Sequence, residues 1–155
     1  MTKAVVSLGS NLGDRSWYLR RAMEMLGSMP ETRLIKASGV IETRPVDVPP
    51  GCEEMKFLNQ AAVFATELSA EEFSRRMHSI EDALGRVRTV RNAPRTIDID
   101  LIDFGGIRMN TPELVLPHPR AAERDFVTVP LKELGIEMGV GNILRVPLTR
   151  NSTRG

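Results

Sequence analysis

The chain has 155 residues, of which 41% are hydrophobic and 26% charged, and this indicates one globular domain. A formal net charge of +1 argues against a general binder of nucleic acid or of membrane surfaces, so any cationic site must be local. The lone Cys52 excludes a disulfide within the chain, and no apolar run approaches the roughly 20 residues of a membrane span. We therefore expect a cytoplasmic protein with a single domain over residues 1–146 and a frayed polar tail over residues 147–155.

The first third of the chain alternates strand and helix patterns. Residues 3–8 form a short apolar run typical of a buried strand, and the turn GSNLGD then leads to Asp14, a candidate N-cap. The segment that follows predicts a helix, since its apolar residues recur at helical spacing, namely Leu19, Ala22, Met23 and Leu26. Residues 32–43 predict a second strand. Three prolines and a glycine in residues 44–54 indicate a long connection of the kind used as a binding loop.

The middle of the chain holds the clearest helix signal. Residues 57–68 predict a strand, and the letters SAEE place Ser69 three residues before Glu72, as in a capping box. A one-sided apolar stripe follows at steps of four, three and four, made of Phe73, Met77, Ile80 and Leu84. Gly85 is expected to end this helix.

An arginine-rich segment, residues 86–95, leads into a strand pattern over residues 96–104. Gly105 and Gly106 predict a tight hairpin to a short return strand over residues 107–110, and brief helical signals follow. The order β-α-β-β-α-β, with an extra hairpin strand and short C-terminal helices, predicts an α+β protein. We expect a ferredoxin-like sandwich in which two helices cover a mostly antiparallel sheet.

Two aspartates interrupt the strand pattern of residues 96–104. Alternation directs Ile97, Ile99 and Leu101 toward the core, and it places Asp98 and Asp100 together on the other face, roughly 7 Å apart. Magnesium in proteins is commonly held by one or two carboxylates, with water and substrate phosphates completing its shell. A solvent-facing side of an edge strand is the alternative. Asp103 is expected on the opposite face near the hairpin, in a structural role.

Four arginines precede this pair within ten residues that contain no acid: Arg86, Arg88, Arg91 and Arg95. Guanidinium groups bind phosphate oxygens bidentately and stay charged at working pH. A solvated run of charge is the common alternative. Because the segment runs directly into the aspartates through Pro94, we favour a site for a metal ion and a triphosphate.

Further candidates come from short motifs. The GSNLGD turn lets a ligand approach the backbone but contains no Walker A or G-x-G-x-x-G pattern, so a ligand loop and a plain turn both stay open. His118, between two prolines, is a candidate for binding phosphate or for stabilising a turn. Phe57, Asn59 and Phe126 are candidates for holding a flat heterocycle, with core packing as the alternative for both rings.

Together these motifs resemble the 6-hydroxymethyl-7,8-dihydropterin pyrophosphokinase family of folate biosynthesis. The segments that carry the resemblance run in order from about residue 3 to residue 134: LGSNLGDR, ETRPV, FLNQAAVFATELSAEEF, IEDALGRVR, APRTIDIDLIDFG and LVLPHPRAAERDFVTVPL. The resemblance implies a ferredoxin-like fold and transfer of pyrophosphate from ATP to the pterin's hydroxymethyl oxygen, which leaves AMP. It also implies loops at about residues 43–56 and 86–95 that close over both substrates.

The resemblance assigns roles to individual residues. It implies two magnesium ions held by Asp98 and Asp100, which count as catalytic together with Arg86, Arg88 and Arg95. It implies an ATP site made of Arg86, Arg88, Arg95, His118, Arg124 and Glu81. It implies a pterin site made of Gly9, Thr43, Val46, Phe57, Asn59 and Phe126. We expect a monomer whose partners are these two small substrates, with neither nucleic acid nor a membrane.

Five positions depart from the usual family pattern. They are Ile41 in place of tyrosine, Arg44 in place of a small residue or proline, Asp47 in place of glycine, His78 in place of glutamine and Asn92 in place of a loop aromatic. These departures affect loop closure and turnover rate more than the type of reaction. Three alternatives stay open: a pterin-binding homologue with impaired catalysis, a magnesium-dependent nuclease, and a small RNA-binding module. The low aromatic content disfavours the last of these.

Overall fold

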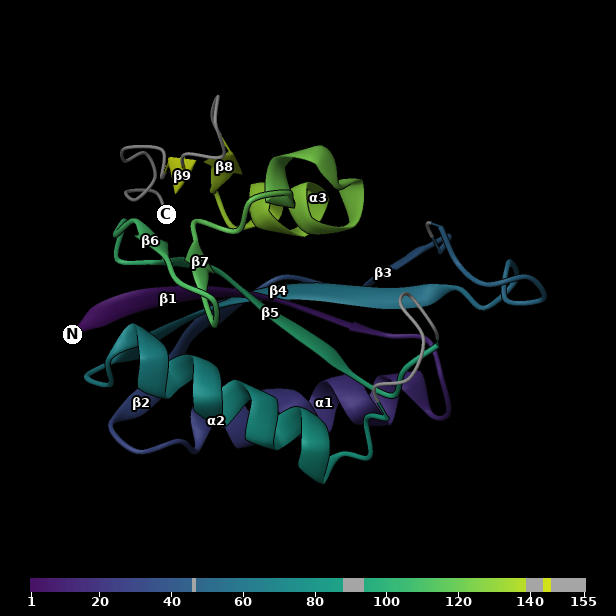
Figure 1. The fold of residues 1–155 in the computed structure, drawn as a ribbon, viewed down its shortest axis with the longest axis horizontal. Coiled ribbons are helices and arrows are strands. Elements are labelled where there is room, and N and C mark those ends of the chain that lie inside the picture. Colours follow the sequence, from purple (N-terminus) through teal and green to yellow (C-terminus); the bar gives the residue numbers. More distant parts are fainter. Residues whose placement is uncertain (46, 88–93, 139–143, 146–155) are drawn as a thin grey trace.

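In the computed structural model of the protein, an antiparallel sheet with helices on both faces forms the body of the molecule (Figure 1). The structure describes residues 1–45, 47–87, 94–138 and 144–145. The sheet has the strand order β2-β4-β1-β5, and β3 also pairs with β4; its strands are β1 (Thr2–Ser10), β2 (Thr32–Ala37), β3 (Ile41–Thr43), β4 (Phe57–Thr66) and β5 (Asp98–Phe104). The mixed helical and antiparallel fold predicted from the sequence is confirmed.

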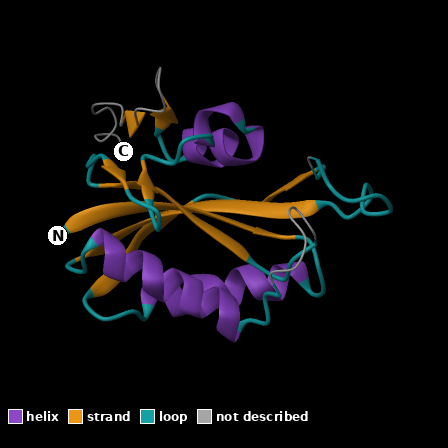
Figure 2. Cartoon of the chain, in the orientation of Figure 1, coloured by secondary structure: helices purple, strands orange, loops and turns teal. Residues whose placement is uncertain are grey.

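The helices form two unequal layers (Figure 2). α1 (Arg15–Gly27) and α2 (Ala70–Ala83) cover one face of the sheet, and α3 (Asp125–Glu133) lies on the other. Two small antiparallel pairs complete the fold: β6 (Met109–Asn110) with β7 (Val115–Leu116), which lies against β5, and β8 (Glu137–Met138) with β9 (Leu144–Arg145), where β8 lies beside α3. A 3-10 turn, η1 (Ala121–Glu123), precedes α3. Among the described residues, no helix has the length and apolarity needed to cross a membrane.

Side-chain caps explain where the two long helices begin. Asp14 Oδ1 accepts a hydrogen bond from the Trp17 N–H at 3.1 Å, as predicted, and α1 starts at the next residue. Ser69 Oγ accepts from the Glu72 N–H at 3.1 Å at the start of α2. The predicted capping box is only half present, because the Glu72 carboxylate is bound to Arg75 and Arg76 instead.

The end of α2 determines where the following arginine lies. Gly85 adopts a φ of +86°, a left-handed conformation that glycine takes without strain. The Gly85 N–H donates to the Asp82 carbonyl and the Arg86 N–H to the Glu81 carbonyl, both at 3.1 Å, which is a Schellman motif. This turn reverses the chain and brings Arg86 back toward the last turn of its own helix.

Apolar side chains fill both spaces between sheet and helices. The larger cluster lies between the sheet and the α1–α2 layer and includes three phenylalanines. The ring centroid of Phe73 lies 6.5 Å from that of Phe64 and 5.9 Å from that of Phe104. The smaller cluster lies between the sheet and α3 and is centred on Ala61, Ile102 and Leu131. Because β1 has neighbours on both edges and helices on both faces, its residues 4–10 are all buried.

Two strand predictions were wrong. The strand expected over residues 32–43 is broken between β2 and β3, because Ser38 Oγ accepts the Ala61 N–H at 2.9 Å and replaces a carbonyl in the ladder. The return strand expected after Gly105 does not pair with β5: β6 pairs with β7, and the His118 N–H donates to the Ile102 carbonyl of β5 at 2.8 Å. The predicted tail, residues 147–155, lies outside the described residues, so the domain boundary at residue 146 stays a prediction.

Candidate active site

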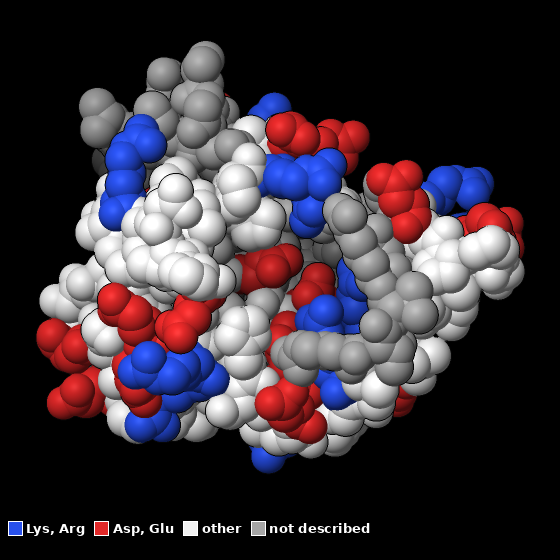
Figure 3. Space-filling model, viewed as in Figure 1, with Lys and Arg blue, Asp and Glu red and all other residues white. Residues whose placement is uncertain are grey.

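A cavity of about 360 Å³ is hollowed into the sheet face that carries α3. Figure 3 shows acidic and basic side chains beside one another at a hollow on this side of the molecule. The structure brings together eight of the residues predicted for the site, all of them lining this cavity: Gly9, Phe57, Asn59, Arg95, Asp98, Asp100, Arg124 and Phe126. They come from β1, β4, the segment that leads into β5, β5 itself and the start of α3, which are separated in the sequence but adjacent in the fold.

The two aspartates of β5 face the cavity as predicted. Ile97, Ile99 and Leu101 are buried in the core on the opposite face, so the alternation predicted from the sequence is confirmed. Burial, reinforced by the charges of Asp98 and then of Glu81, raises the pKa of Asp100 to about 8, against the opposing influence of Arg124 and Arg86. Two carboxylates are thus held where their charges repel, an arrangement that a cation would stabilise.

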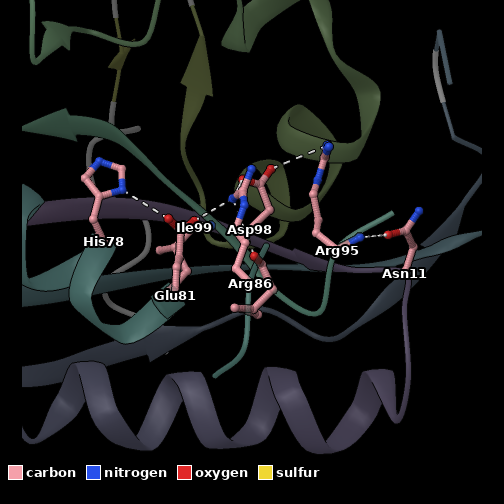
Figure 4. Close-up of polar contacts among 8 residues, drawn as sticks. Asn11, His78, Glu81, Arg86, Arg95, Asp98 and Ile99 are labelled. Carbon is pink, nitrogen blue, oxygen red and sulfur yellow. Dashed lines mark hydrogen bonds and ion pairs between the residues drawn. The ribbon is translucent and has the colours of Figure 1, made fainter. Parts of the chain in front are cut away.

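Glu81 fixes the strand that carries these aspartates (Figure 4). Its carboxylate is 1% exposed, and Oε2 accepts hydrogen bonds from the Ile99 N–H at 2.6 Å and from Arg86 Nη1 at 2.8 Å. Oε1 lies 3.0 Å from Nδ1 of His78. Since Ile99 stands between Asp98 and Asp100, Glu81 holds the backbone of the aspartate pair from behind. The structure places Glu81 beneath the site and not in the cavity lining, and its predicted part in ATP binding stays a prediction.

Arginines bracket the first aspartate. Arg86 Nη1 donates to Asp98 Oδ1 at 2.5 Å, and Arg95 Nη2 lies 3.8 Å from Asp98 Oδ2. Burial of Arg86 opposes its charge, but the carboxylates of Asp98 and Glu81 outweigh that effect and raise its pKa. The expected closeness of the arginine segment to the aspartates is therefore confirmed for both described arginines; Arg88 lies outside the described residues.

An arginine guanidinium group lies over the ring of each of the two cavity phenylalanines. Arg95 Cζ lies 5.1 Å from the centroid of Phe57, and Arg124 Cζ lies 5.6 Å from the centroid of Phe126. The arginines predicted to bind phosphate thus lie directly beside the rings predicted to bind a heterocycle. The cavity therefore has a charged part, made of Arg95, Asp98, Asp100 and Arg124, and an aromatic part, made of Phe57, Asn59 and Phe126.

Asn59 is the amide of the aromatic part. Its side chain is buried, and Nδ2 donates to Thr43 Oγ1 at 2.6 Å, so Thr43 orients the amide although it does not line the cavity itself. Gly9 lies opposite Asn59 in the sheet register. A Cβ at Gly9 would lie 3.0 Å from Asn59 Oδ1 and 3.2 Å from Phe57 Cδ1, so glycine is what allows these two side chains to pack over β1.

His118 adjoins the charged part of the site. Its Nδ1 accepts a hydrogen bond from the Arg120 N–H at 3.3 Å, which leaves Nε2 as the donor of the neutral ring. Burial and then the charge of Arg124 lower the pKa of His118, although Asp98 acts in the opposite direction. The ring is therefore neutral at pH 7, a state in which it can donate one hydrogen bond to an anion.

Four residues that line the cavity were not predicted from the sequence, namely Ser7, Arg120, Glu123 and Asp125. Ser7 follows from Gly9 by strand alternation, whereas the other three belong to a motif from which only His118, Arg124 and Phe126 had been selected. Arg44 and Asp47, noted only as departures from the family, also line the cavity. Asp47 adopts a φ of +51°, which explains why glycine suits this position and why aspartate is tolerated. Val46 and Asn92 lie outside the described residues.

The fold and the cavity define a class of protein. A carboxylate pair flanked by arginines, next to an amide and two aromatic rings, is typical of an enzyme that binds a polyphosphate and a flat heterocycle together. The described residues contain no group of three or more His, Cys, Asp or Glu side chains placed to hold a metal ion, so a cation at β5 would need further ligands from substrate or water.

The chain belongs to the 7,8-dihydro-6-hydroxymethylpterin-pyrophosphokinase (HPPK) family, whose model matches residues 5–136. It is 40% identical over 131 residues to a Bacillus subtilis 2-amino-4-hydroxy-6-hydroxymethyldihydropteridine pyrophosphokinase, covering 84% of this chain and 77% of that protein. It is also 40% identical over 141 residues to the enzyme of that name from Methylorubrum extorquens, covering 91% of this chain and 87% of the other.

Among solved structures, the fold is similar to that of HPPK-DHPS from Plasmodium falciparum, in a crystal structure with pterin and p-hydrobenzoate. The TM-score is 0.62 at 15% identity, and the match covers 85% of this chain. It covers 40% of that longer chain, so the likeness concerns only part of the Plasmodium protein. At this identity the likeness is one of fold, and it agrees with the mixed helix and antiparallel sheet architecture described above.

Proposed function

We propose that this chain transfers pyrophosphate from ATP to the hydroxymethyl oxygen of 6-hydroxymethyl-7,8-dihydropterin and releases AMP, a step of folate biosynthesis. The observation that carries the proposal is the position of Asp98. It lies on the cavity face of β5 between Arg86 and Arg95, in the same cavity as Asn59 and Phe57. Membership of the HPPK family supports the same conclusion independently.

Asp98 and Asp100 are the proposed holders of magnesium, with two ions accompanying ATP. Their hard oxygen donors suit Mg²⁺, and the pKa of Asp100 is raised by burial and then by the charges of Asp98 and Glu81. When bound, the ions would neutralise charge on the phosphates during transfer. Glu81 holds the backbone of β5 from the opposite side of the strand, and Arg86 donates directly to Asp98 Oδ1.

The described arginines and His118 are the proposed phosphate ligands. Arg86 and Arg95 lie next to Asp98, and Arg95 and Arg124 line the cavity. A guanidinium group stays charged at working pH. His118, neutral at pH 7, donates from Nε2. Arg88 is included in the proposal on the family resemblance, since it lies outside the described residues.

The pterin is proposed to lie between the aromatic rings. Phe57 and Phe126 offer their faces once the guanidinium groups of Arg95 and Arg124 turn to phosphate. Asn59, oriented by Thr43, hydrogen-bonds the edge of the heterocycle, and Gly9 leaves the room for it. Val46, outside the described residues, is proposed to contribute backbone groups on the family resemblance.

Catalysis then follows mainly from position and charge. The pterin alcohol attacks the β-phosphorus of ATP and gives up its hydroxyl proton to water, the bond from that phosphorus to the α–β bridging oxygen breaks, and AMP leaves with that oxygen. Arg86, Arg95 and Arg124 stabilise the negative charge on the transferring group and on AMP, while the rings and Asn59 hold the alcohol in line. A ferredoxin-like description of the fold and a monomeric state belong to this proposal; the strand order β2-β4-β1-β5 supports the former.

One assay tests the function. The protein is mixed with Mg-ATP and the reduced pterin alcohol, and the nucleotide products are separated. We expect AMP in proportion to the pterin supplied. Release of ADP, or hydrolysis of ATP independent of pterin, would refute the proposal. Pterin binding without any nucleotide product would instead indicate a binding homologue with impaired catalysis.

A further inference from the structure

Asn11, the first residue after β1, makes three hydrogen bonds to two loops that are distant in the sequence. Its side chain is buried, with 4% of the residue exposed. Oδ1 accepts from the Arg95 N–H at 2.9 Å, and Nδ2 donates to the Met55 carbonyl at 3.1 Å. Figure 4 shows the bond from the Arg95 N–H to the Asn11 side chain. The Asn11 N–H also donates to the Arg95 carbonyl at 3.1 Å, so both backbone polar groups of Arg95 are bound by one residue.

Only a primary amide of this length satisfies both side-chain partners. A backbone N–H can only donate and a backbone carbonyl can only accept, so the side chain must offer one acceptor and one donor. Aspartate would keep the acceptor for Arg95 but would place a second oxygen against the Met55 carbonyl. Alanine would remove both bonds. Substitution at this one position can therefore remove the Met55 bond alone, with aspartate, or both side-chain bonds, with alanine.

The Arg95 bonds of Asn11 lead to the charged part of the cavity. With its backbone held at both polar groups, Arg95 directs its guanidinium toward Asp98 Oδ2, 3.8 Å away, and over the ring of Phe57. A shift of the Arg95 backbone would move this cation relative to the aspartate. The position of a proposed phosphate ligand thus depends on a residue that does not itself line the cavity.

The Met55 bond leads to the aromatic part. Met55 lies two residues before Phe57, and the intervening Lys56 carbonyl accepts from Arg15 Nη1 at 2.9 Å. The same Arg15 nitrogen bonds Glu42 Oε2 at 2.9 Å, next to Thr43, which orients Asn59. The bonds of Asn11 and Arg15 therefore tether the chain immediately before Phe57.

We propose that Asn11 is a positioning residue. By binding the backbone of both Met55 and Arg95, it fixes the aromatic part of the cavity relative to the charged part. The inference rests on the proposed function and extends it to a residue outside the cavity. Asn11 touches neither substrate. It acts through Phe57 on one side and through Arg95 on the other.

The test compares Asn11→Asp with Asn11→Ala in steady-state kinetics, with KM for Mg-ATP, KM for the pterin, kcat and Tm measured for each. Asn11→Asp should raise the pterin KM about tenfold and leave the Mg-ATP KM within about twofold, since only the Met55 bond is lost. Asn11→Ala should raise both KM values about tenfold. Arg15→Ala, a change at a half-exposed side chain, should raise the pterin KM alone, by about threefold.

Gln60→Ala is the matched control. Gln60 also donates an amide N–H to a backbone carbonyl, that of Ser38 at 2.8 Å, but it does not line the cavity. It should lower Tm to a similar extent without changing either KM. If Asn11→Asp stayed active and changed both KM values equally, or changed neither, the positioning role of Asn11 would be overturned while the proposed function would stand. A wild-type protein that makes no pterin-dependent AMP would overturn the proposed function as well.

Discussion

Replacement of Glu81 tests whether a buried carboxylate behind β5 holds the aspartate pair in place. In the structure this group is 1% exposed and accepts hydrogen bonds from the Ile99 N–H and from Arg86. Glu81→Ala removes the carboxylate entirely, whereas Glu81→Gln keeps one carbonyl oxygen and nearly the same volume. We expect graded losses of stability and of turnover in the two variants.

The size of the loss follows from what each variant leaves without a partner. A buried unpaired donor costs about 1–3 kcal/mol, and removing one member of a buried ion pair costs about 3–5 kcal/mol. Arg86 keeps Asp98 as a partner, so we expect Glu81→Ala to lose about 3–4 kcal/mol of unfolding free energy. Glu81→Gln should lose about 1–2 kcal/mol, or a fall in Tm of roughly 2–8 °C.

Both variants should also lose catalytic efficiency. A displacement of reacting groups by about 1 Å can reduce a rate on the order of a hundredfold. We therefore expect kcat/KM for Mg-ATP to fall about 100-fold in Glu81→Ala and about tenfold in Glu81→Gln, with a higher Mg²⁺ requirement in both. These values are measured below the Tm of each variant, by the AMP assay and by Mg²⁺ titration.

Glu72→Gln is the control on the same helix. The Glu72 carboxylate binds only Arg75 and Arg76 among the contacts described for it, at the surface of α2. Its replacement should leave Tm and turnover unchanged. Wild-type kcat/KM in Glu81→Ala, or an equal loss in Glu72→Gln, would refute the positioning role.

Three further predictions concern the cavity. Asp98→Ala should abolish turnover with a native circular dichroism spectrum, and an unfolded variant would show that this side chain belongs to the core. Burial and Asp98 raise the pKa of Asp100 to about 8, so ionising Asp100 destabilises the metal-free fold as the pH rises from about 4 to about 8. Asp100→Asn escapes this loss: its Tm relative to wild type should increase between pH 5 and pH 9, and a constant difference would contradict the shift. Asn59→Ala should raise the pterin KM more than the Mg-ATP KM. Gly9→Ala should do the same, because it places a methyl group 3.0 Å from Asn59 Oδ1. Equal rises in the two KM values would show that Asn59 does not bind the edge of the pterin.

Local rules were sufficient for much of the fold. The start of α2 at Ser69 follows from one hydroxyl at the N-cap, and the apolar stripe from Phe73 to Leu84 is a property of the helix alone. The faces of β5 follow from alternation, because a strand reverses side-chain direction at every residue. These predictions needed no knowledge of which elements meet in space.

Contacts between distant segments could not be predicted in this way. The bonds of Asn11 reach residues 44 and 84 positions away, and both are to backbone atoms, which leave no mark in the residue types of their partners. The place of Glu81 depends on which side of α2 meets β5. The break at Ser38 depends on a hydroxyl replacing a carbonyl in the ladder with β4. Only the assembled fold determines such contacts.

The most direct test of the central claim, that this cavity moves a pyrophosphate group as one unit, is to follow phosphorus through the reaction. ATP labelled in turn at the α, β and γ positions is incubated with the protein, magnesium and the pterin alcohol. We predict that the β and γ labels pass in equal amounts to the pterin and that the α label stays in AMP. Transfer of the γ label alone, or its release as free phosphate, would contradict the account.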